Sequence, residues 1–333
     1  MLFKDTTEIQ QYMEVDTTVN FPSLKSSIRA AEKELIVPVL GLSFYLDLNT
    51  KYNTGTLSNK EKDLVEVIQA ALAPHSIYLY IPKSEANITD GGIRRNETDT
   101  SKTAYQYQVT NLREALRSES EKAVEFLLAF LEEKKADHPV WSSTPEFRRY
   151  RSLFIKTGSQ FNELYNTASP YRNYFAMRST MENVEQQVIK KLIGDALFKA
   201  LKDKDQLNDP VWSEYEQTLL YRLKKCIANL TIASATSSLA VRIDEYGLSV
   251  TSAFTSTSND QISKRGAAAD NQISQLSREA RTAGETWLND AVDYLRENAS
   301  LLIFPQWFSW QISLALTPTV TVCRDFDGIF SMF

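Results

Sequence analysis

Two stretches of sequence decide the fold: residues 28–48 read IRAAEKELIVPVLGLSFYLDL, and residues 181–201 read MENVEQQVIKKLIGDALFKAL. Aligning Gly41 with Gly194 gives an offset of 153 residues (194 − 41) and brings the apolar residues of the two stretches into register. In both, apolar residues recur at the i, i+3, i+4, i+7 spacing of an amphipathic helix. The sequence therefore predicts one helical unit that occurs twice.

The correspondence continues in the same order along the chain, which is the signature of an internal duplication. Its offset grows toward the end, so an insertion is expected in the second copy, within residues 255–275. The pairs that show this are Leu64 with Leu219 and Gly92 with Gly247, both at an offset of 155 (219 − 64), and Val124 with Leu288 at an offset of 164 (288 − 124).

Each copy is predicted to contain three helices and a short β-hairpin. Before the third helix, ITDGGIRR in the first copy and VRIDEYGLSVTSAFTS in the second are typical of hairpins, because Asp-Gly-Gly and Tyr-Gly suit a turn with positive φ. Ser58 with Glu61 has the form of a capping box at the start of the second helix. The helices are expected at about 23–48, 58–80 and 103–135, and at about 178–202, 211–240 and 259–298.

The predicted fold class is mainly α, with two tandem diverged helical units and an extended C-terminal arm. Prolines and a glycine cluster between the copies, and helical periodicity is lost after residue 300. Deleting residues 301–333 is therefore expected to leave helix content nearly unchanged and to abolish assembly. The expected organisation is a first unit at 1–135, a linker with short helices at 136–175, a second unit at 176–300 and the arm at 301–333.

Composition argues against several classes of protein. The chain has 333 residues, a net charge of −5 and no strongly basic block, so nucleic-acid binding is not expected as its primary function. Two cysteines make no disulfide framework, which favours a reducing compartment. The N-terminus lacks the apolar core of a signal peptide, and prolines and glutamines interrupt the apolar stretch 301–322. We expect no membrane association.

No catalytic, cofactor-binding or metal site is predicted. The sequence lacks the common zinc, EF-hand and phosphate-loop patterns, and its only histidines are His75 and His138. Partners of a histidine need not be near in sequence, so a catalytic site is not excluded by spacing, but a structural role is the preferred interpretation. The pair Gly91-Gly92 offers either a hairpin turn or backbone N–H groups for an anion, and we favour the turn.

Interface residues are expected instead at the N-terminal helix, at the two turns and along the arm. The aromatic run near residue 307 fits either a core beneath a helix layer or an anchor between chains, since tryptophan is enriched at interfaces. The candidates are Phe3, Ile9, Gly91, Gly92, Gly247, Trp307, Phe308, Trp310 and Phe333.

The first unit resembles the opening of phage head–tail connector proteins, also called adaptor or head-completion proteins. The resemblance rests on a short N-terminal helix, an acidic turn, a helix that ends at Leu-Gly, and the second apolar helix LVEVIQAALAPHSIYLY; it covers about the first 130 residues. With ITDGGI and DHPVW, the whole chain is most similar to an uncharacterised family of phages and prophages of Bacteroides-type bacteria. The matching residues are Ile9, Tyr12, Asp16, Leu24, Ile28, Ala31, Ile36, Leu40 and Gly41.

This resemblance implies a structural virion protein of the phage neck. Copies of the chain would form a homo-oligomeric ring that joins the portal protein to other neck or tail proteins and extends the DNA channel. Genomic DNA would pass through without specific binding, since an acidic lumen repels phosphates. The implied location is the virion neck, with host cytoplasm before assembly. The alternatives are another neck or tail-completion ring protein and a non-viral bacterial helical interaction module.

Overall fold

The structure of this chain is a computed structural model, and it is mainly helical, as the sequence predicted. It consists of a first unit, residues 1–151, and a second unit, residues 153–316, each defined by its own hydrophobic core. The residues that the structure describes are 1–16, 19–84, 86–89, 92–95, 104–167, 170–207, 210–239, 241–244, 247–250 and 270–316.

The first unit contains short helices at its two ends and two long helices between them. Its elements are α1 (Thr6–Gln10), α2 (Phe21–Ala31), the π-helical turn η1 (Glu32–Ile36), α3 (Val37–Leu40), α4 (Leu42–Thr54), α5 (Asn59–Ser84), β1 (Ala86–Thr89), β2 (Gly92–Arg95), α6 (Gln106–Glu133), α7 (Pro139–Ser142) and α8 (Pro145–Arg151).

The second unit repeats this order almost element for element. It comprises α9 (Gly158–Leu164), α10 (Pro170–Val184), the π-helical turn η2 (Glu185–Ile189), α11 (Lys190–Ile193), α12 (Asp195–Asp205), α13 (Glu214–Leu239), β3 (Val241–Asp244), β4 (Gly247–Val250), α14 (Asp270–Asn298) and α15 (Pro305–Leu316).

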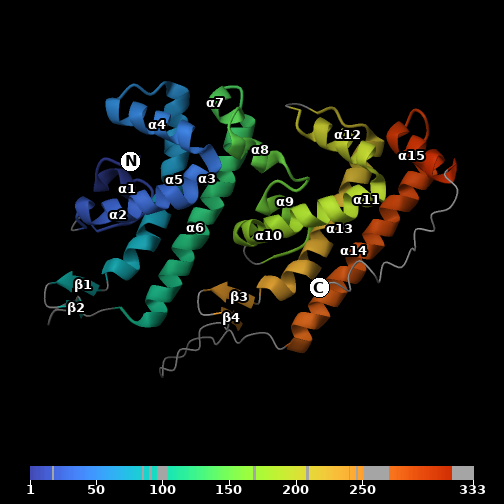
Figure 1. Cartoon of the computed structure of the whole chain (residues 1–333). Coiled ribbons are helices and arrows are strands. Elements are labelled where there is room, and N and C mark those ends of the chain that lie inside the picture. Colours follow the sequence, from blue (N-terminus) through green and yellow to red (C-terminus); the bar gives the residue numbers. More distant parts are fainter. Residues whose placement is uncertain are drawn as a thin grey trace.

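The two units lie side by side and point the same way (Figure 1). In each, the strands stand at one end, and α4 or its counterpart α12 stands at the other. The side of the first unit that carries α6 faces the side of the second unit that carries α9 and α10. In each unit the strongest packing joins the two long helices, α5 with α6 and α13 with α14.

The helix expected at 23–48 is broken in the structure, and so is its counterpart at 178–202. The first break is the π-helical turn, η1 or η2, where an extra residue per turn rotates the following helix. The second is Gly41 or Gly194, with φ values of +84° and +82°, which end α3 and α11. Because this conformation is strained for any residue with a Cβ atom, glycine stands at both positions.

Helix starts also recur between the copies. The side chains of Asp5 and Thr157 cap α1 and α9 by accepting a hydrogen bond from the backbone three residues on. Ser58 and Glu61 form the predicted capping box at α5, in which the serine backbone N–H donates to the glutamate carboxylate at 2.8 Å. Ser213 and Glu216 form the same arrangement at α13, also at 2.8 Å.

One pair of short antiparallel strands follows the first long helix of each unit, α5 or α13. Strand β1 pairs with β2 so that Thr89 lies opposite Gly92, and β3 pairs with β4 so that Asp244 lies opposite Gly247. The residues that join the strands within each pair, including Gly91, lie outside the described residues.

The hydrophobic cores place the unit boundary differently from the expected linker at 136–175. Trp141, Phe147 and Tyr150 belong to the first core, whereas Leu153 and Phe154 begin the second. Residues 153–161 correspond to residues 1–9, so the second unit begins near residue 153 instead of 176. Sequence comparison missed this because the two opening segments share helix-capping chemistry and apolar positions but few identical residues.

The prediction of an extended C-terminal arm at 301–333 is wrong for residues 301–316. Residues 305–316 form the helix α15, and Phe304 and Trp307 are buried in the second core. The motif Pro305-Gln-Trp307 corresponds to Pro139-Val-Trp141 of the first unit, at an offset of 166 (307 − 141). The arm therefore completes the second unit, and its deletion removes core side chains. Residues 317–333 lie outside the described part of the chain.

Among the described residues, α5 alone is long and apolar enough to cross a membrane by length and composition. Half of its most apolar stretch is buried within the first unit, as expected of the central helix of a core.

Candidate interaction surfaces

A buried carboxylate follows α2 and α10 in the two units, at the start of each π-helical turn. Glu32 is 2% exposed and Glu185 is 1% exposed. Glu32 accepts a hydrogen bond from the backbone N–H of Leu2 at 2.6 Å, and Glu185 accepts one from Phe154 at 2.7 Å. Each glutamate therefore ties the opening segment of its unit to the helices behind it.

The electrostatics of this carboxylate are clearest in the second unit. Burial raises the pKa of Glu185, and the nearby Lys202 ammonium partly offsets this effect. Burial likewise lowers the pKa of Lys202, whose Nζ also donates to the carbonyl of Ser152 at 2.7 Å. The two groups face each other at 2.5 Å and satisfy each other, so they form a structural ion pair and not a reactive site.

The contact between the units is anchored by Glu125 of α6. Its carboxylate accepts hydrogen bonds from the backbone N–H groups of Gly158 and Ser159, at 2.8 and 3.1 Å, and from the Ser159 hydroxyl at 2.8 Å. Gly158 and Ser159 begin α9, where unpaired N–H groups favour a negative charge. An acid of the first unit thus caps a helix of the second.

Arg151 of α8 forms the second anchor between the units. Its guanidinium donates to the carbonyl oxygens of Asp205, Gln206 and Leu207, at 2.8 to 3.1 Å, just where α12 ends. Glu132 of α6 lies 3.8 Å from the same guanidinium. A cation at the carbonyl end of a helix complements the helix dipole, so this contact fixes α12 against the first unit.

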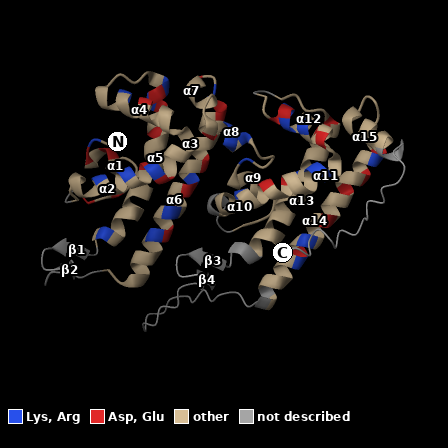
Figure 2. Ribbon diagram, in the orientation of Figure 1, with Lys and Arg blue, Asp and Glu red and all other residues tan. Residues whose placement is uncertain are grey.

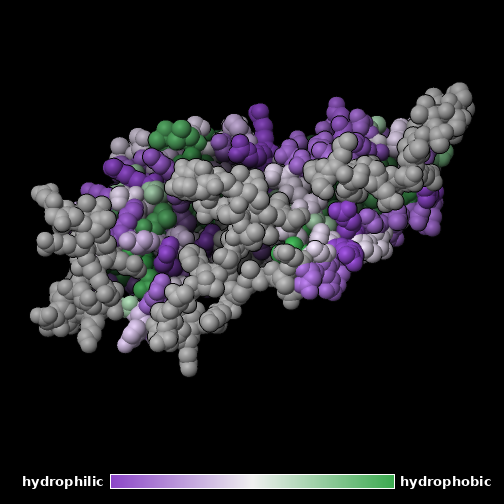
Figure 3. All heavy atoms as spheres, turned by 60° about the horizontal axis from the view of Figure 1, so that its bottom comes forward, coloured by the Kyte–Doolittle hydropathy of each residue, from purple (hydrophilic) through white to green (hydrophobic). Residues whose placement is uncertain are grey.

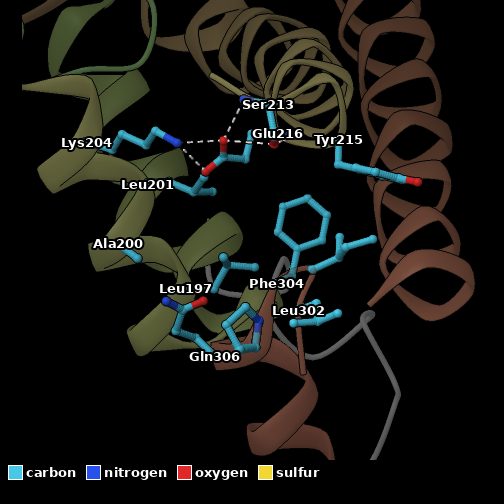
Figure 4. Close-up of a pocket in the computed structure, with 12 residues that line it drawn as sticks. Leu197, Ala200, Leu201, Lys204, Ser213, Tyr215, Glu216, Leu302, Phe304 and Gln306 are labelled. Atoms are coloured by element: carbon cyan, nitrogen blue, oxygen red, sulfur yellow. Dashed lines mark hydrogen bonds and ion pairs between the residues drawn. The ribbon is translucent and has the colours of Figure 1, made fainter. Parts of the chain in front are cut away.

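A shallow pocket with both apolar and polar lining residues lies at the end of the second unit that carries α12 (Figure 4). It has a volume of about 380 Å³ and is framed by α12, the start of α13 and the turn before α15. Phe304 points into it, and Lys204 and Glu216 form an ion pair at 2.7 Å along one edge. Leu302 stands at its mouth and is 94% exposed.

The corresponding place in the first unit is occupied by an ion pair and a buried histidine. There Lys60 forms an ion pair with Asp137, and His138 is buried between aromatic rings. In the second unit Tyr215 and Ile303 replace that ion pair at the equivalent positions. Phe304, which replaces the histidine, adopts a φ of +53°, and such backbone strain clusters at binding sites. These replacements make the positions around the pocket in the second unit less charged than their counterparts in the first.

Other exposed apolar side chains are scattered. On the face drawn in Figure 3, the described hydrophobic residues appear as small patches between hydrophilic ones. Leu301, which precedes the pocket residue Leu302 in the chain, is also exposed, so two adjacent leucines are open to solvent at this end. Clustered apolar exposure of this kind is typical of a protein-contact surface.

The interface residues predicted from the sequence differ in their exposure. Phe3, Ile9 and Trp307 are buried in the cores of their own units, so they stabilise the fold and are not available to another chain. Trp310 is partly buried against Gly194, and Phe308 is partly exposed on α15. Gly92 and Gly247 begin β2 and β4, and Gly91 and Phe333 lie outside the described residues.

The histidines occupy packed positions. His75 lies 3.4 Å from both Glu34 and Ser120, and burial lowers its pKa. These three residues have the types of a hydrolase triad, but Ser120 is fully buried and its hydroxyl donates to the carbonyl of Arg117. Among the described residues, no group of three or more metal-ligating side chains occurs.

Sequence reasoning missed the residues that join the units. Glu125 and Arg151 are charged residues among many others, and nothing local marks them as partners of a segment some 30 to 50 residues away. A signal did exist for the pocket, because the turn 300–304 carries adjacent leucines where the first unit has Lys135 and Ala136.

Comparison with known proteins gives one match. A family of unknown function (DUF6712) matches residues 36–151 and 189–311. These segments begin 153 residues apart (189 − 36), the same offset that relates Gly41 to Gly194. No curated protein and no solved structure matches the chain. The two segments together span well over half of the sequence, and the chain therefore belongs to this family of unknown function.

Proposed function

We propose that this protein is a structural component of a phage neck and not an enzyme. In this proposal, copies of the chain form a ring that joins the portal to the tail and extends the DNA channel. The observation that carries the proposal is the packing of two copies of one helical unit side by side in the same orientation. Such a contact joins two different faces, and contacts of this kind build rings or filaments when repeated.

The charge distribution supports passage of DNA over binding of DNA. Acidic and basic residues are interspersed along the helices of both units in Figure 2, and the net charge is −5. A protein that holds DNA by its phosphates presents a basic face. A ring built from this chain would allow DNA to slide through its lumen.

The two ends of the molecule supply surfaces for two different neighbours. The apolar surface around Leu301 and Leu302 lies at the α12 end, and the paired strands of both units lie at the opposite end. Each unit of three main helices and paired strands thus spans the distance between the ends. One end would contact the portal, and the other would contact the next neck or tail protein.

The test is to locate the chain in particles of the phage that encodes it, by immunogold labelling and electron microscopy. Label at the junction of head and tail is the expected result. Label spread over the capsid shell, or particles that lack the protein, would contradict the proposal. Purified chain that turns over a small-molecule substrate would contradict it as well.

A further inference from the structure

Each outer side of the molecule carries a face that is equivalent to one of the two faces that meet between the units. Within the chain, the α6 side of the first unit covers the α9–α10 side of the second. The counterpart of α6 is α14, on the far side of the second unit. The counterparts of α9 and α10 are α1 and α2, on the far side of the first unit. These two outer faces are equivalent to surfaces that already bind each other.

From this relationship we infer that a second copy of the chain docks its α1–α2 face on the α14 face of the first, so that the contact within the chain is repeated between chains. The inference deepens the proposed function, on which it rests for the choice of a second copy as the partner. It also defines the interface as heterologous, with the two copies using different faces.

The polar residues that anchor the contact between the units have polar counterparts on the outer faces. The counterpart of Glu125 on α14 is Asn289, which is exposed and keeps a side-chain oxygen as a hydrogen-bond acceptor. The counterpart of Ser159 on α1 is Thr7, which is exposed and keeps the hydroxyl group. The Thr7 hydroxyl donates to the Asp5 carboxylate of its own copy, so it would have to exchange this partner for the Asn289 side-chain oxygen of the neighbouring copy.

The apolar part of the contact is retained as well. Tyr174 of α10 is 1% exposed, and its counterpart Phe21 on α2 is partly exposed. On α6, Leu128 lies on the same helical face as Glu125 and is buried, whereas its counterpart Val292 on α14 is partly exposed. Both outer faces therefore carry an apolar side chain that a neighbour would cover.

The outer faces also carry complementary charge. Exposed positions on α2 include Lys25 and Arg29, whereas those on α14 include Glu285. Asp293 of α14 is also exposed, and it pairs with Arg296 of the same helix. Opposite charges across an interface steer association and fix the register. Two α2 faces would bring the Lys25 and Arg29 side chains of both copies together, which disfavours a symmetric contact through this face.

The test uses two full-length variants, each blocked on one face. Glu285→Arg/Asn289→Arg blocks the α14 face, and Lys25→Glu/Arg29→Glu blocks the α1–α2 face. We expect the unaltered chain to form larger species as its concentration rises in sedimentation-velocity experiments. Each variant alone should remain a monomer, because its two faces then carry like charges. An equimolar mixture of the two should associate again, because each face of one variant meets a face of opposite charge on the other.

Two controls accompany this test. Circular dichroism and thermal unfolding must show that both variants fold, which is expected because all four positions are exposed. Leu302→Ser alters the pocket end and should associate like the unaltered chain. If the mixture of blocked variants stays monomeric while the unaltered chain associates, the head-to-tail contact is wrong, but a ring built through another face remains open to the labelling test. If the unaltered chain stays monomeric at its highest soluble concentration, the inference fails.

Discussion

Lys202 and Glu185 form an ion pair inside the second unit, where the first unit has Asn49 and Glu32 at the equivalent positions. Glu32 lies 4.0 Å from the α-amino group of Met1, to which Asn49 also binds. The two copies therefore bring different cations to the same buried carboxylate. Because an unpaired buried charge is costly, Lys202 is expected to stabilise the second copy by pairing with this glutamate.

Replacing Lys202 with Met should leave Glu185 buried without its cation. We expect the free energy of unfolding to fall by about 3–5 kcal/mol, as for other broken buried pairs. Urea unfolding followed by circular dichroism measures this loss. Lys199→Met, an exposed lysine on the same helix, should change little. The double variant Glu185→Leu/Lys202→Met should regain most of the stability, and a double variant as unstable as the single one would show that the pair itself is not the cause.

Gly194→Ala should be far more damaging than Gly55→Ala, although both glycines have positive φ. A Cβ atom at Gly194 would lie 3.0 Å from the ring of Trp310, whereas at Gly55 nothing lies within 4 Å. Gly55 is in the left-handed region, where the backbone strain costs about 1–2 kcal/mol. Gly194 combines a φ of 82° with a ψ of 148°, a conformation that essentially only glycine adopts, and overpacking against the ring adds about 1–3 kcal/mol. Thermal unfolding of the two variants compares these costs directly. Equal losses would mean that the Trp310 ring moves aside freely.

Trp141→Phe should cost more stability than Trp307→Phe. The indole N–H of Trp141 donates to the carbonyl of Val39 at 3.0 Å, whereas the indole N–H of Trp307 has no hydrogen-bond partner in the structure. The first substitution leaves a buried acceptor unsatisfied, and the difference should be about 1 kcal/mol. Chemical denaturation gives both values, and the reverse order would contradict the prediction.

The charged form of Glu61 should stabilise the fold, so its contribution should be present at neutral pH and lost in acid. Burial raises its pKa, but hydrogen bonds from Lys51 and Ser58 outweigh this and lower the pKa from 4.5 to about 2. A carboxyl whose folded pKa is depressed stabilises the protein above its unfolded pKa, and this contribution is lost as the pH falls through the folded value.

Glu61→Gln should therefore lower the free energy of unfolding by about 1–2 kcal/mol at neutral pH, a value reduced for the solvent exposure of Lys51. Between pH 4.5 and about 2 the difference between the two proteins should shrink toward zero. Urea titrations across this range measure it. A difference that stays constant with pH would show that packing, and not the charge of Glu61, is responsible.

The repeat was accessible from the sequence because it depends on local patterns. Apolar spacing defined the long helices, and the offsets of 153, 155 and 164 residues are those at which α4, α5 and α6 relate to α12, α13 and α14. The capping boxes at Ser58 and Ser213 were also visible or implied, because a cap and its acid lie three residues apart. Such features need no knowledge of distant partners.

By itself, the sequence determined that the chain is helical and built from one unit used twice, since helical periodicity and capping are short-range properties of the chain. Only the tertiary structure decided where the units meet, which aromatic residues fill the cores and which stay outside. Trp307 and Leu302 lie five residues apart in one apolar stretch, yet one is buried and the other is almost fully exposed. Their difference arises because burial depends on which surfaces pack together. The packing of the two units is fixed by contacts of Glu125 and Arg151 with segments that are distant in the sequence.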